Sequence, residues 1–237
     1  MKKFKLFCLP YAGGSAAIYN KWRQYLDRRI ELHPLDLAGR GRRIYDPLYD
    51  SIAEAVDDVY KIIDSQLDQM PYCFFGHSMG GIIAYELALK IRSLRRPQPV
   101  HIFFAGRGAP NVPGEDEKNF HQLPQEEFKK EILDLGGTPK EFFEHPELID
   151  VLLPMLRSDF KIAETYKFAG TGAIKPLDYD ISVFIGKEED VTAEQMHGWR
   201  EHTTGICAVY YFAGEHFFIN EETERIVKIV NRTLLSI

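Results

Sequence analysis

The chain has few cysteines, fewer basic than acidic residues, and no apolar run long enough to cross a membrane. Its three cysteines, Cys8, Cys73 and Cys207, are widely spaced, and no Cys-x-x-Cys pair indicates a zinc or dithiol site. They lie in or beside apolar runs, so we expect small buried thiols in a reducing compartment. The basic start faintly resembles a signal peptide, but Lys5 and Pro10 leave its apolar stretch too short. We therefore expect a cytoplasmic protein that does not enter a membrane.

The charge balance excludes a generic nucleic-acid binder. There are 29 Lys and Arg residues against 35 Asp and Glu, which gives a net charge of -6, whereas such proteins need a basic footprint. Hydrophobic residues make up 45% of the 237 residues, enough for a sizeable core. No repeat, linker or low-complexity segment divides the chain. We expect one domain over residues 1–237 and take a monomer as the default.

One short motif dominates the sequence, Gly76-x-Ser78-x-Gly80. The aromatic run Tyr72–Phe75 before it predicts a buried strand, and Ile82–Ile91 after it predicts a helix. A strand that turns directly into a helix at a serine needs glycines on both sides, because side chains there would clash. The pattern alone also fits a structural turn. Its context favours a nucleophile lifted out of the sheet at a helix N-terminus.

Strand and helix patterns alternate through most of the chain. This rhythm predicts a mainly parallel sheet with helices on both faces, and Pro34 indicates a strand near the edge. The strands are expected at Phe4–Leu9, Ile30–Leu37, Tyr72–Phe75, Val100–Ala105, Ile181–Ile185 and Ala208–Phe212. The main covering helices are expected at Ile18–Leu26, after Ser51, at Ile82–Ile91, after Thr192, and at Glu221–Leu235.

The alternation breaks between Gly106 and Asp178, where no convincing strand occurs. Three helical segments take its place, at Pro124–Leu135, Thr138–Phe143 and Pro146–Phe168. We interpret residues 107–178 as a helical insertion. Its large apolar residues either pack the insertion itself or form a lid over Ser78 that lines an acyl pocket, and both can hold for different faces.

A serine hydroxyl needs a base to take its proton, and the base needs an acid to orient it. His216 is the candidate base, because it follows the last strand, where ligands gather at the carboxyl ends of a parallel sheet. His77 adjoins the serine, but the turn should point it elsewhere. The acid should follow the preceding strand. Asp190 fits best, and Glu188 and Glu189 compete with it.

The order Ser78, Asp190, His216 is that of the α/β-hydrolases. The oxyanion hole would be formed by the backbone N–H groups of Met79, directly after the nucleophile, and of Ala12, in the glycine-rich loop after the first strand. That loop is not a phosphate loop, since no Gly-Lys-Ser/Thr follows it. We expect no metal.

A second basic loop, Gly39–Arg43, carries three arginines. Arg40, Arg42 and Arg43 are either a solvated surface or a site for an anionic ligand or partner, because arginine forks suit phosphates.

The chain resembles the type II thioesterases, the free-standing editing enzymes of nonribosomal peptide and polyketide synthesis. The resemblance runs nearly end to end. It rests on Leu9-Pro10-Tyr11-Ala12-Gly13-Gly14-Ser15, Gly39-Arg40-Gly41-Arg42-Arg43, Phe75-Gly76-His77-Ser78-Met79-Gly80, Gly106-Arg107-x-Ala109-Pro110, Gly186 with Asp190, and Gly214-x-His216-Phe217-Phe218.

The resemblance implies an α/β-hydrolase fold and hydrolysis of misprimed or stalled acyl groups from the phosphopantetheine arm of carrier proteins. It implies no bound cofactor, because phosphopantetheine arrives with the substrate. We then expect Arg40, Arg42 or Arg43 to contact the carrier protein or the phosphate of its arm. The alternatives are a small-molecule carboxylesterase or lipase with the same triad, and a non-catalytic binding module, which the intact Ser, Asp and His argue against.

Overall fold

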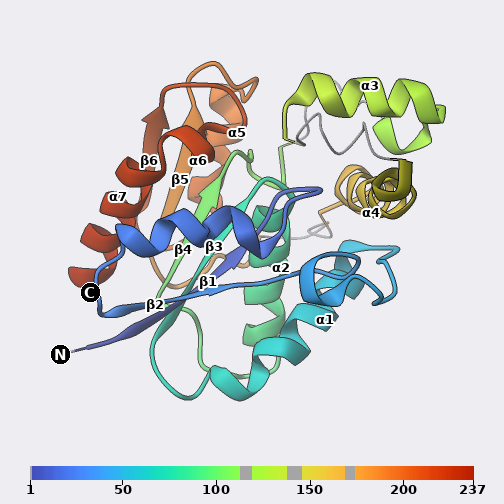
Figure 1. Cartoon of the computed structure of the whole chain (residues 1–237). Coiled ribbons are helices and arrows are strands. Elements are labelled where there is room, and N and C mark those ends of the chain that lie inside the picture. The colour runs from blue at the N-terminus through green and yellow to red at the C-terminus, as the bar shows by residue number, and fades with distance from the viewer. Residues whose placement is uncertain (1, 113–118, 138–145, 169–173) are drawn as a thin grey trace.

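The computed structural model describes residues 2–112, 119–137, 146–168 and 174–237 (Figure 1). Six strands form one sheet in the order β2-β1-β3-β4-β5-β6, and all five neighbouring pairs are parallel. This confirms the predicted fold class and places β2 at an edge, as Pro34 indicated. The strands are β1 (Phe4–Leu9), β2 (Ile30–Pro34), β3 (Tyr72–His77), β4 (His101–Ala105), β5 (Ile181–Gly186) and β6 (Cys207–Phe212).

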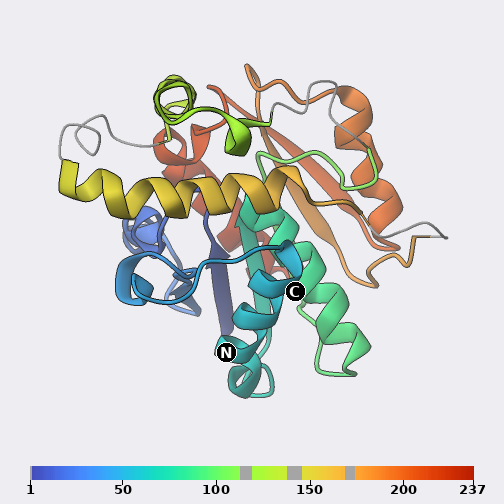
Figure 2. The ribbon, with the colours of Figure 1, turned by 90° about the vertical axis from the view of Figure 1, so that its right-hand side faces the viewer.

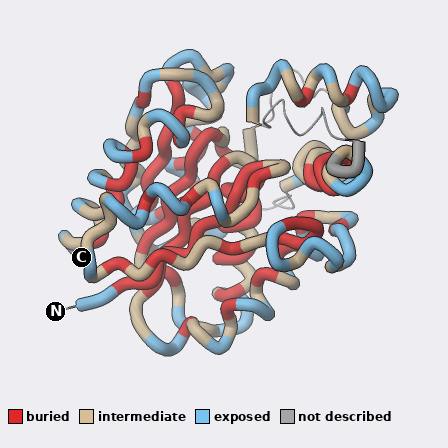
Figure 3. The backbone as a smooth tube through the Cα atoms, in the orientation of Figure 1, coloured by how far each residue is buried: buried red, intermediate tan, exposed pale blue. Residues whose placement is uncertain are grey.

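Helices cover both faces of the sheet, so its inner strands are buried on both sides (Figures 1 and 3). Adjacent residues of β3 point to opposite faces: Phe74 joins the core under α1 (Ile52–Ile63) and α2 (Met79–Ser93). Phe75 joins the core under the 3-10 helix η1 (Ala16–Gln24) and α7 (Thr223–Leu235). Continuous apolar runs in the central strands therefore follow from two-sided burial.

Helix α1 shows how the sequence pattern sets local structure. The hydroxyl of Ser51 accepts the backbone N–H of Glu54 and caps the helix. This confirms the helix expected after Ser51, and its apolar residues at helical spacing face the core: Ile52, Val56, Val59 and Ile63, followed by Leu67. The smaller elements are η2 (Gly41–Arg43), η3 (Asp64–Gln66), α5 (Ala193–Gly198), η6 (Trp199–His202) and α6 (Phe218–Glu221).

The segment between β4 and β5 contains η4 (Phe120–Gln122), α3 (Gln125–Leu135) and α4 (Pro146–Glu164). Helices α3 and α4 share a small core of their own, while Ile162 near the end of α4 joins the main core. Figure 2 shows α4, in yellow, lying across the molecule beside the start of α2. The predicted helix at Thr138–Phe143 lies outside the described residues.

The remaining differences from prediction are at element ends. The helix predicted at Ile18–Leu26 is the 3-10 helix η1, which begins at Ala16 and ends at Gln24. The predicted strand Ile30–Leu37 ends at Pro34, and the last bond to β1 runs from the Leu35 N–H to the Cys8 carbonyl at 2.9 Å. No described helix is long and apolar enough to span a membrane.

Candidate active site

Ser78 lies at the junction of β3 and α2, at the carboxyl end of the sheet. Its backbone has φ 53° and ψ -117°, an unusual conformation for a residue other than glycine. The neighbours fix it: the Ser78 N–H donates to the carbonyl of Ala105 at 2.8 Å, and its carbonyl accepts the N–H of Gly81 at 2.9 Å. The geometry is that of the strained strand-to-helix turn which exposes a nucleophile.

The two glycines of the motif are needed for close backbone approach. A Cβ on Gly76 would lie 2.3 Å from the carbonyl oxygen of Gly80. A Cβ on Gly80 would lie 2.3 Å from the carbonyl oxygen of Leu9. The second contact also shows that the end of β1 lies directly against the first turn of α2. The glycine-rich loop after β1 is therefore next to the N-terminus of that helix.

His216 lies in the loop after β6, and its partner is Glu189, in the loop after β5. The distance from His216 Nδ1 to Glu189 Oε1 is 2.5 Å. The Glu189 side chain is only 6% exposed, and its other oxygen accepts the N–H of Gly186 at 3.1 Å. Because Glu189 accepts at Nδ1, that nitrogen carries the proton and Nε2 is left as the basic nitrogen.

The predicted partner Asp190 is corrected to Glu189. The chain turns tightly at this point. The N–H of Glu189 donates to the carbonyl of Gly186, and the N–H of Val191 donates to the carbonyl of Glu189. This turn directs Glu189 inward, whereas Asp190 is exposed. Glu188 is exposed as well. The sequence has three consecutive carboxylates here, and nothing in it indicates which of them faces His216.

The ring of His77 packs against His216. The two ring centroids are 5.0 Å apart, and His77 Nε2 donates to the carbonyl of His216 at 2.9 Å. Burial, and then the neighbouring imidazole of His216, lower the pKa of His77 well below its usual value, so His77 stays neutral. Gly106 makes room for this packing: a Cβ there would lie 2.6 Å from His77 Nε2.

The structure brings the two predicted oxyanion donors into one region. Met79 is the first residue of α2, so its N–H has no partner within the helix. Ala12 lies in the loop whose start packs on Gly80. Within the described part of the chain, the Ala12 N–H donates no hydrogen bond. Ser78 and His216 are not joined by a hydrogen bond among these residues, and such contacts often tighten only when substrate binds.

The three arginines of Gly39–Arg43 have different surroundings. Arg40 is only 4% exposed and is paired with Asp159 of α4, so it cannot meet a partner on the surface, and that prediction is wrong. Arg43 is held by Asp58 at 2.6 Å and Asp46 at 2.7 Å. Of the three, only Arg42 is exposed, and it has no ion pair among the described residues.

Sequence reasoning missed Asp159, which is 1% exposed. A signal was present: Asp159 follows Met155 and Leu156 at the spacing of one helical turn, on a stripe of large apolar residues. A carboxylate on such a stripe is buried and needs a cation. The cation, Arg40, lies 119 positions earlier and could not be identified from spacing.

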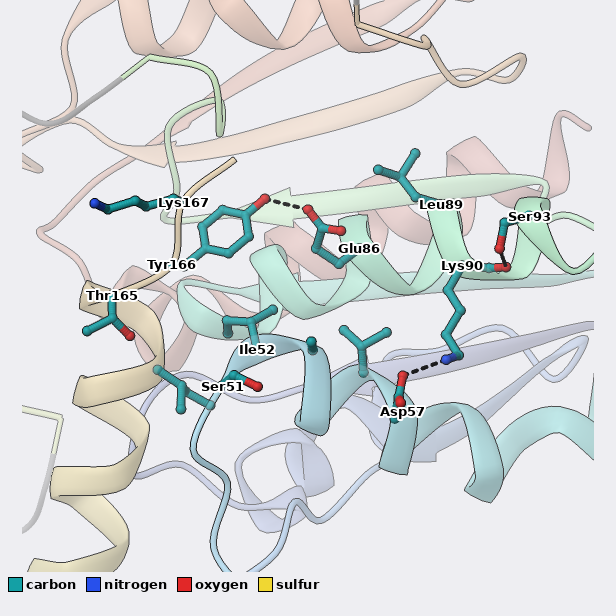
Figure 4. A pocket seen from close by; sticks show the side chains of 13 residues that line it. Ser51, Ile52, Asp57, Glu86, Leu89, Lys90, Ser93, Thr165, Tyr166 and Lys167 are labelled. Carbon is teal, nitrogen blue, oxygen red and sulfur yellow. Dashed lines mark hydrogen bonds and ion pairs between the residues drawn. The ribbon is translucent and has the colours of Figure 1, made fainter. Parts of the chain in front are cut away.

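A groove of about 570 Å³ lies away from this site, between α1, α2 and the end of α4 (Figure 4). Tyr166 donates to Glu86 across it at 2.5 Å, and Lys90 pairs with Asp57 at 2.5 Å. Glu86 is eight residues along α2 from Ser78, about 12 Å of helix rise. None of the residues that line the groove is a predicted site residue.

Together these groups suit acyl transfer. Ser78 would be the nucleophile, His216 the base and Glu189 the orienting acid, beside two backbone donors at a helix N-terminus. In the described residues, no cluster of side chains is arranged to hold a metal ion.

Comparisons with known proteins agree with this chemistry. The model of the thioesterase domain family matches residues 4–234. Linear gramicidin dehydrogenase LgrE from Brevibacillus parabrevis is 37% identical, covering 98% of this chain and 88% of that protein. Gramicidin S biosynthesis protein GrsT from Aneurinibacillus migulanus is 34% identical, covering 98% and 89%. The crystal structure of ClbQ, from the colibactin nonribosomal peptide and polyketide pathway, is 36% identical with a TM-score of 0.91, covering 99% and 98%.

The chain contains no Gly-x-Gly-x-x-Gly sequence, which is the dinucleotide-binding fingerprint.

Proposed function

The chain belongs to the thioesterase family, and from this premise we propose that it is an editing thioesterase that releases misprimed or stalled acyl groups from carrier proteins of nonribosomal peptide or polyketide synthesis. The single observation that carries the chemistry is the contact between His216 and the buried carboxylate of Glu189. This contact lies at the same end of the sheet as the strained Ser78.

The acylation step begins when Ser78 Oγ attacks the thioester carbonyl and its proton passes to His216 Nε2. Glu189 stabilises the imidazolium that forms. The N–H groups of Ala12 and Met79 stabilise the negative oxygen of the tetrahedral intermediate. The carbon–sulfur bond then breaks. The phosphopantetheine sulfur leaves and takes the proton from His216, so the imidazole is neutral again for the next step.

Deacylation repeats the same steps with water. His216 takes a proton from water, which attacks the acyl-serine, and the acid is released as Ser78 regains its proton. This reaction uses no metal and no cofactor resident on the protein, because the pantetheine arm enters with the carrier.

A cytoplasmic location stays a prediction from the free cysteines Cys8, Cys73 and Cys207.

The decisive experiment measures release of acetyl groups from an acetyl-phosphopantetheinyl peptidyl carrier protein, with a nitrophenyl acetate assay alongside. We expect fast release from the carrier and slow ester turnover. The Ser78→Ala variant should lose both activities while keeping its folded circular dichroism spectrum. A preference for the free ester would keep the nucleophile but reassign the protein to small-molecule esterases. Carrier hydrolysis retained by Ser78→Ala would overturn the proposed nucleophile.

We further propose that Arg42 contacts the carrier protein. It is exposed and has no ion pair with any residue that the structure describes, and the neighbouring Tyr45 is 97% exposed. The loop after β2 therefore offers a cation beside apolar surface at the active-site end of the sheet. The Arg42→Glu variant should raise KM for the carrier several-fold at low salt, where charge attraction is strongest, and leave nitrophenyl ester turnover unchanged. The matched control is Arg28→Glu, an exposed arginine before β2 at the opposite end of the sheet. An equal KM for both variants would exclude this contact.

A further inference from the structure

A buried ion pair joins α4 to the loop after β2. Arg40 Nη2 lies 2.6 Å from Asp159 Oδ1, and Arg40 Nη1 lies 2.7 Å from Asp159 Oδ2, so the contact is bidentate. The side chains are 4% and 1% exposed. Burying two charges in this way is costly, and apolar residues of similar shape often give equal stability. Stability alone therefore does not explain the pair.

The pair also contacts the loop after β1. Asp159 Oδ2 accepts the backbone N–H of Gly13 at 2.8 Å. Arg40 Nη1 donates to the carbonyl of Gly14 at 3.0 Å. Gly13 has φ +81°, and the N–H of Gly14 donates to the carbonyl of Tyr11 at 2.9 Å, which closes the turn. The Gly13 N–H belongs to the peptide group that directly follows Ala12, so Asp159 fixes the orientation of that peptide.

The guanidinium is fully used. Besides these bonds, Arg40 Nε and Nη2 both donate to the carbonyl of Ala38 at 3.2 Å. Its five N–H groups therefore match five contacts, two to the carboxylate and three to backbone carbonyls. No other cationic side chain has this fixed fork, which makes the junction rigid.

Helix α4 is seated on the loop after β2 by further contacts beside Asp159. The hydroxyl of Ser158 donates to the carbonyl of Tyr49 at 2.8 Å, and Lys161 pairs with Asp50 at 2.7 Å. Among these contacts, only Asp159 also reaches the loop that holds Ala12. The conformation of that loop thus depends on α4 being in place.

We propose that Arg40 and Asp159 are positioning residues which hold the Ala12 N–H in the oxyanion hole and make that donor depend on the seating of α4. The inference rests on the proposed function, because it assumes that Ala12 supplies an oxyanion donor. When α4 is seated, the Gly13 N–H is bound and the donor is aligned. When Asp159 leaves, the turn loses its acceptor and the tetrahedral intermediate loses one stabilising hydrogen bond.

Two variants separate positioning from stability. In the double variant Arg40→Met with Asp159→Leu, apolar side chains replace both charges, so the fold should persist while the Gly13 N–H loses its acceptor. We expect kcat on the carrier thioester to fall about 10- to 100-fold with KM little changed, below the 100- to 1,000-fold typical of deleting an oxyanion donor. In Asp159→Asn, a side-chain oxygen can still accept from Gly13, and we expect most of this loss to be recovered.

The readout that a merely structural role would not move is the affinity for an alkylboronic acid, which forms a tetrahedral adduct on the serine. Its inhibition constant should rise by the same factor as kcat/KM falls, because both report oxyanion stabilisation. The matched control is Asp58→Asn, which disturbs the neighbouring Arg43 pair but not the loop after β1. This variant should lower the melting temperature and leave kcat and the boronate affinity within twofold of the wild-type values.

The inference is overturned if the double variant and Asp159→Asn both show wild-type kcat and boronate affinity. Should the double variant fail to fold, Arg40→Lys decides, since it keeps the charge but loses most of the five contacts, and wild-type boronate affinity there would also overturn the inference. Failure of the proposed function is distinguishable, because the wild-type protein would then prefer the nitrophenyl ester to the carrier thioester whatever the Asp159 variants do.

Discussion

Glu189 and Asp190 are neighbours in the chain with the same charge, but they have opposite environments. The carboxylate of Glu189 is buried between the His216 ring and the Gly186 N–H, and Asp190 faces solvent. A buried acid that accepts the Nδ1 proton keeps the histidine in the tautomer that can act as a base. An exposed carboxylate cannot hold that tautomer as firmly, because water competes for the hydrogen bond.

At the residue scale, we predict that Glu189→Gln lowers kcat on the carrier thioester by about 100- to 10,000-fold. The amide keeps the shape of the side chain but does not stabilise the imidazolium. Asp190→Asn is the matched control and should stay within twofold of wild type. Single-turnover assays of acyl release measure both. A large loss in Asp190→Asn with an active Glu189→Gln would restore the original assignment of Asp190.

The next scale is that of the element, where the turn from β3 to α2 depends on its glycines to different degrees. Gly76 and Gly80 meet backbone atoms at 2.3 Å, closer than any Cβ can approach. Gly81 is different, since a Cβ there would meet the carbonyl oxygen of Gly76 at 3.4 Å and side-chain atoms of Arg107 at 3.7 Å, which is ordinary contact. The motif Gly-x-Ser-x-Gly-Gly thus contains two obligatory glycines and one that a larger residue can replace.

At this scale we predict that Gly76→Ala lowers the free energy of unfolding by about 1–3 kcal/mol, because the backbone must shift to admit the methyl group. The turn at Ser78 shifts with it, so acyl release should fall as well. Gly81→Ala should be neutral or stabilising by up to about 1 kcal/mol, because alanine favours a helix more than glycine does. Urea denaturation with a parallel activity assay tests the pair. Equal effects of the two substitutions would contradict the contact argument.

For the molecule as a whole, acid should destabilise the fold through its buried histidines. Burial lowers the pKa of His101 and of His202 to about 4. His202 is neutral between Tyr85 and Asn111, with both ring nitrogens hydrogen-bonded at 2.7 Å. In the unfolded chain both histidines have a pKa near 6.5. Between pH 6.5 and 4 the unfolded chain therefore binds more protons, and stability falls as the pH falls.

We predict a loss of about 2 kcal/mol per histidine in the free energy of unfolding between pH 7 and pH 5, at about 1.4 kcal/mol per pH unit below pH 6.5. Urea denaturation at the two pH values measures this loss. His202→Gln should reduce the pH-dependent loss by about 2 kcal/mol. His197→Gln, at an exposed position of α5, should leave it unchanged. An unchanged pH dependence in His202→Gln would show that His202 does not bind the proton differently in the two states.

The sequence by itself determined the sheet and the places of the nucleophile Ser78 and the base His216. Continuous apolar runs and helical stripes are local patterns, and burial on both faces of the sheet enforces them. The turn at Ser78 is local as well, because its glycines are required within two residues of the serine. The place of His216 follows from strand order, since the ends of parallel strands meet at one edge.

Only the tertiary structure decided which carboxylate faces His216, where His77 points, and what Arg40 binds. Each of these depends on how a side chain leaves a loop and on what a distant segment presents to it. Glu189 and Asp190 differ by one residue of a tight turn, and Arg40 and Asp159 are 119 positions apart. Sequence spacing carries no information about such directions, because they arise when the loops and α4 pack against one another over the end of the sheet.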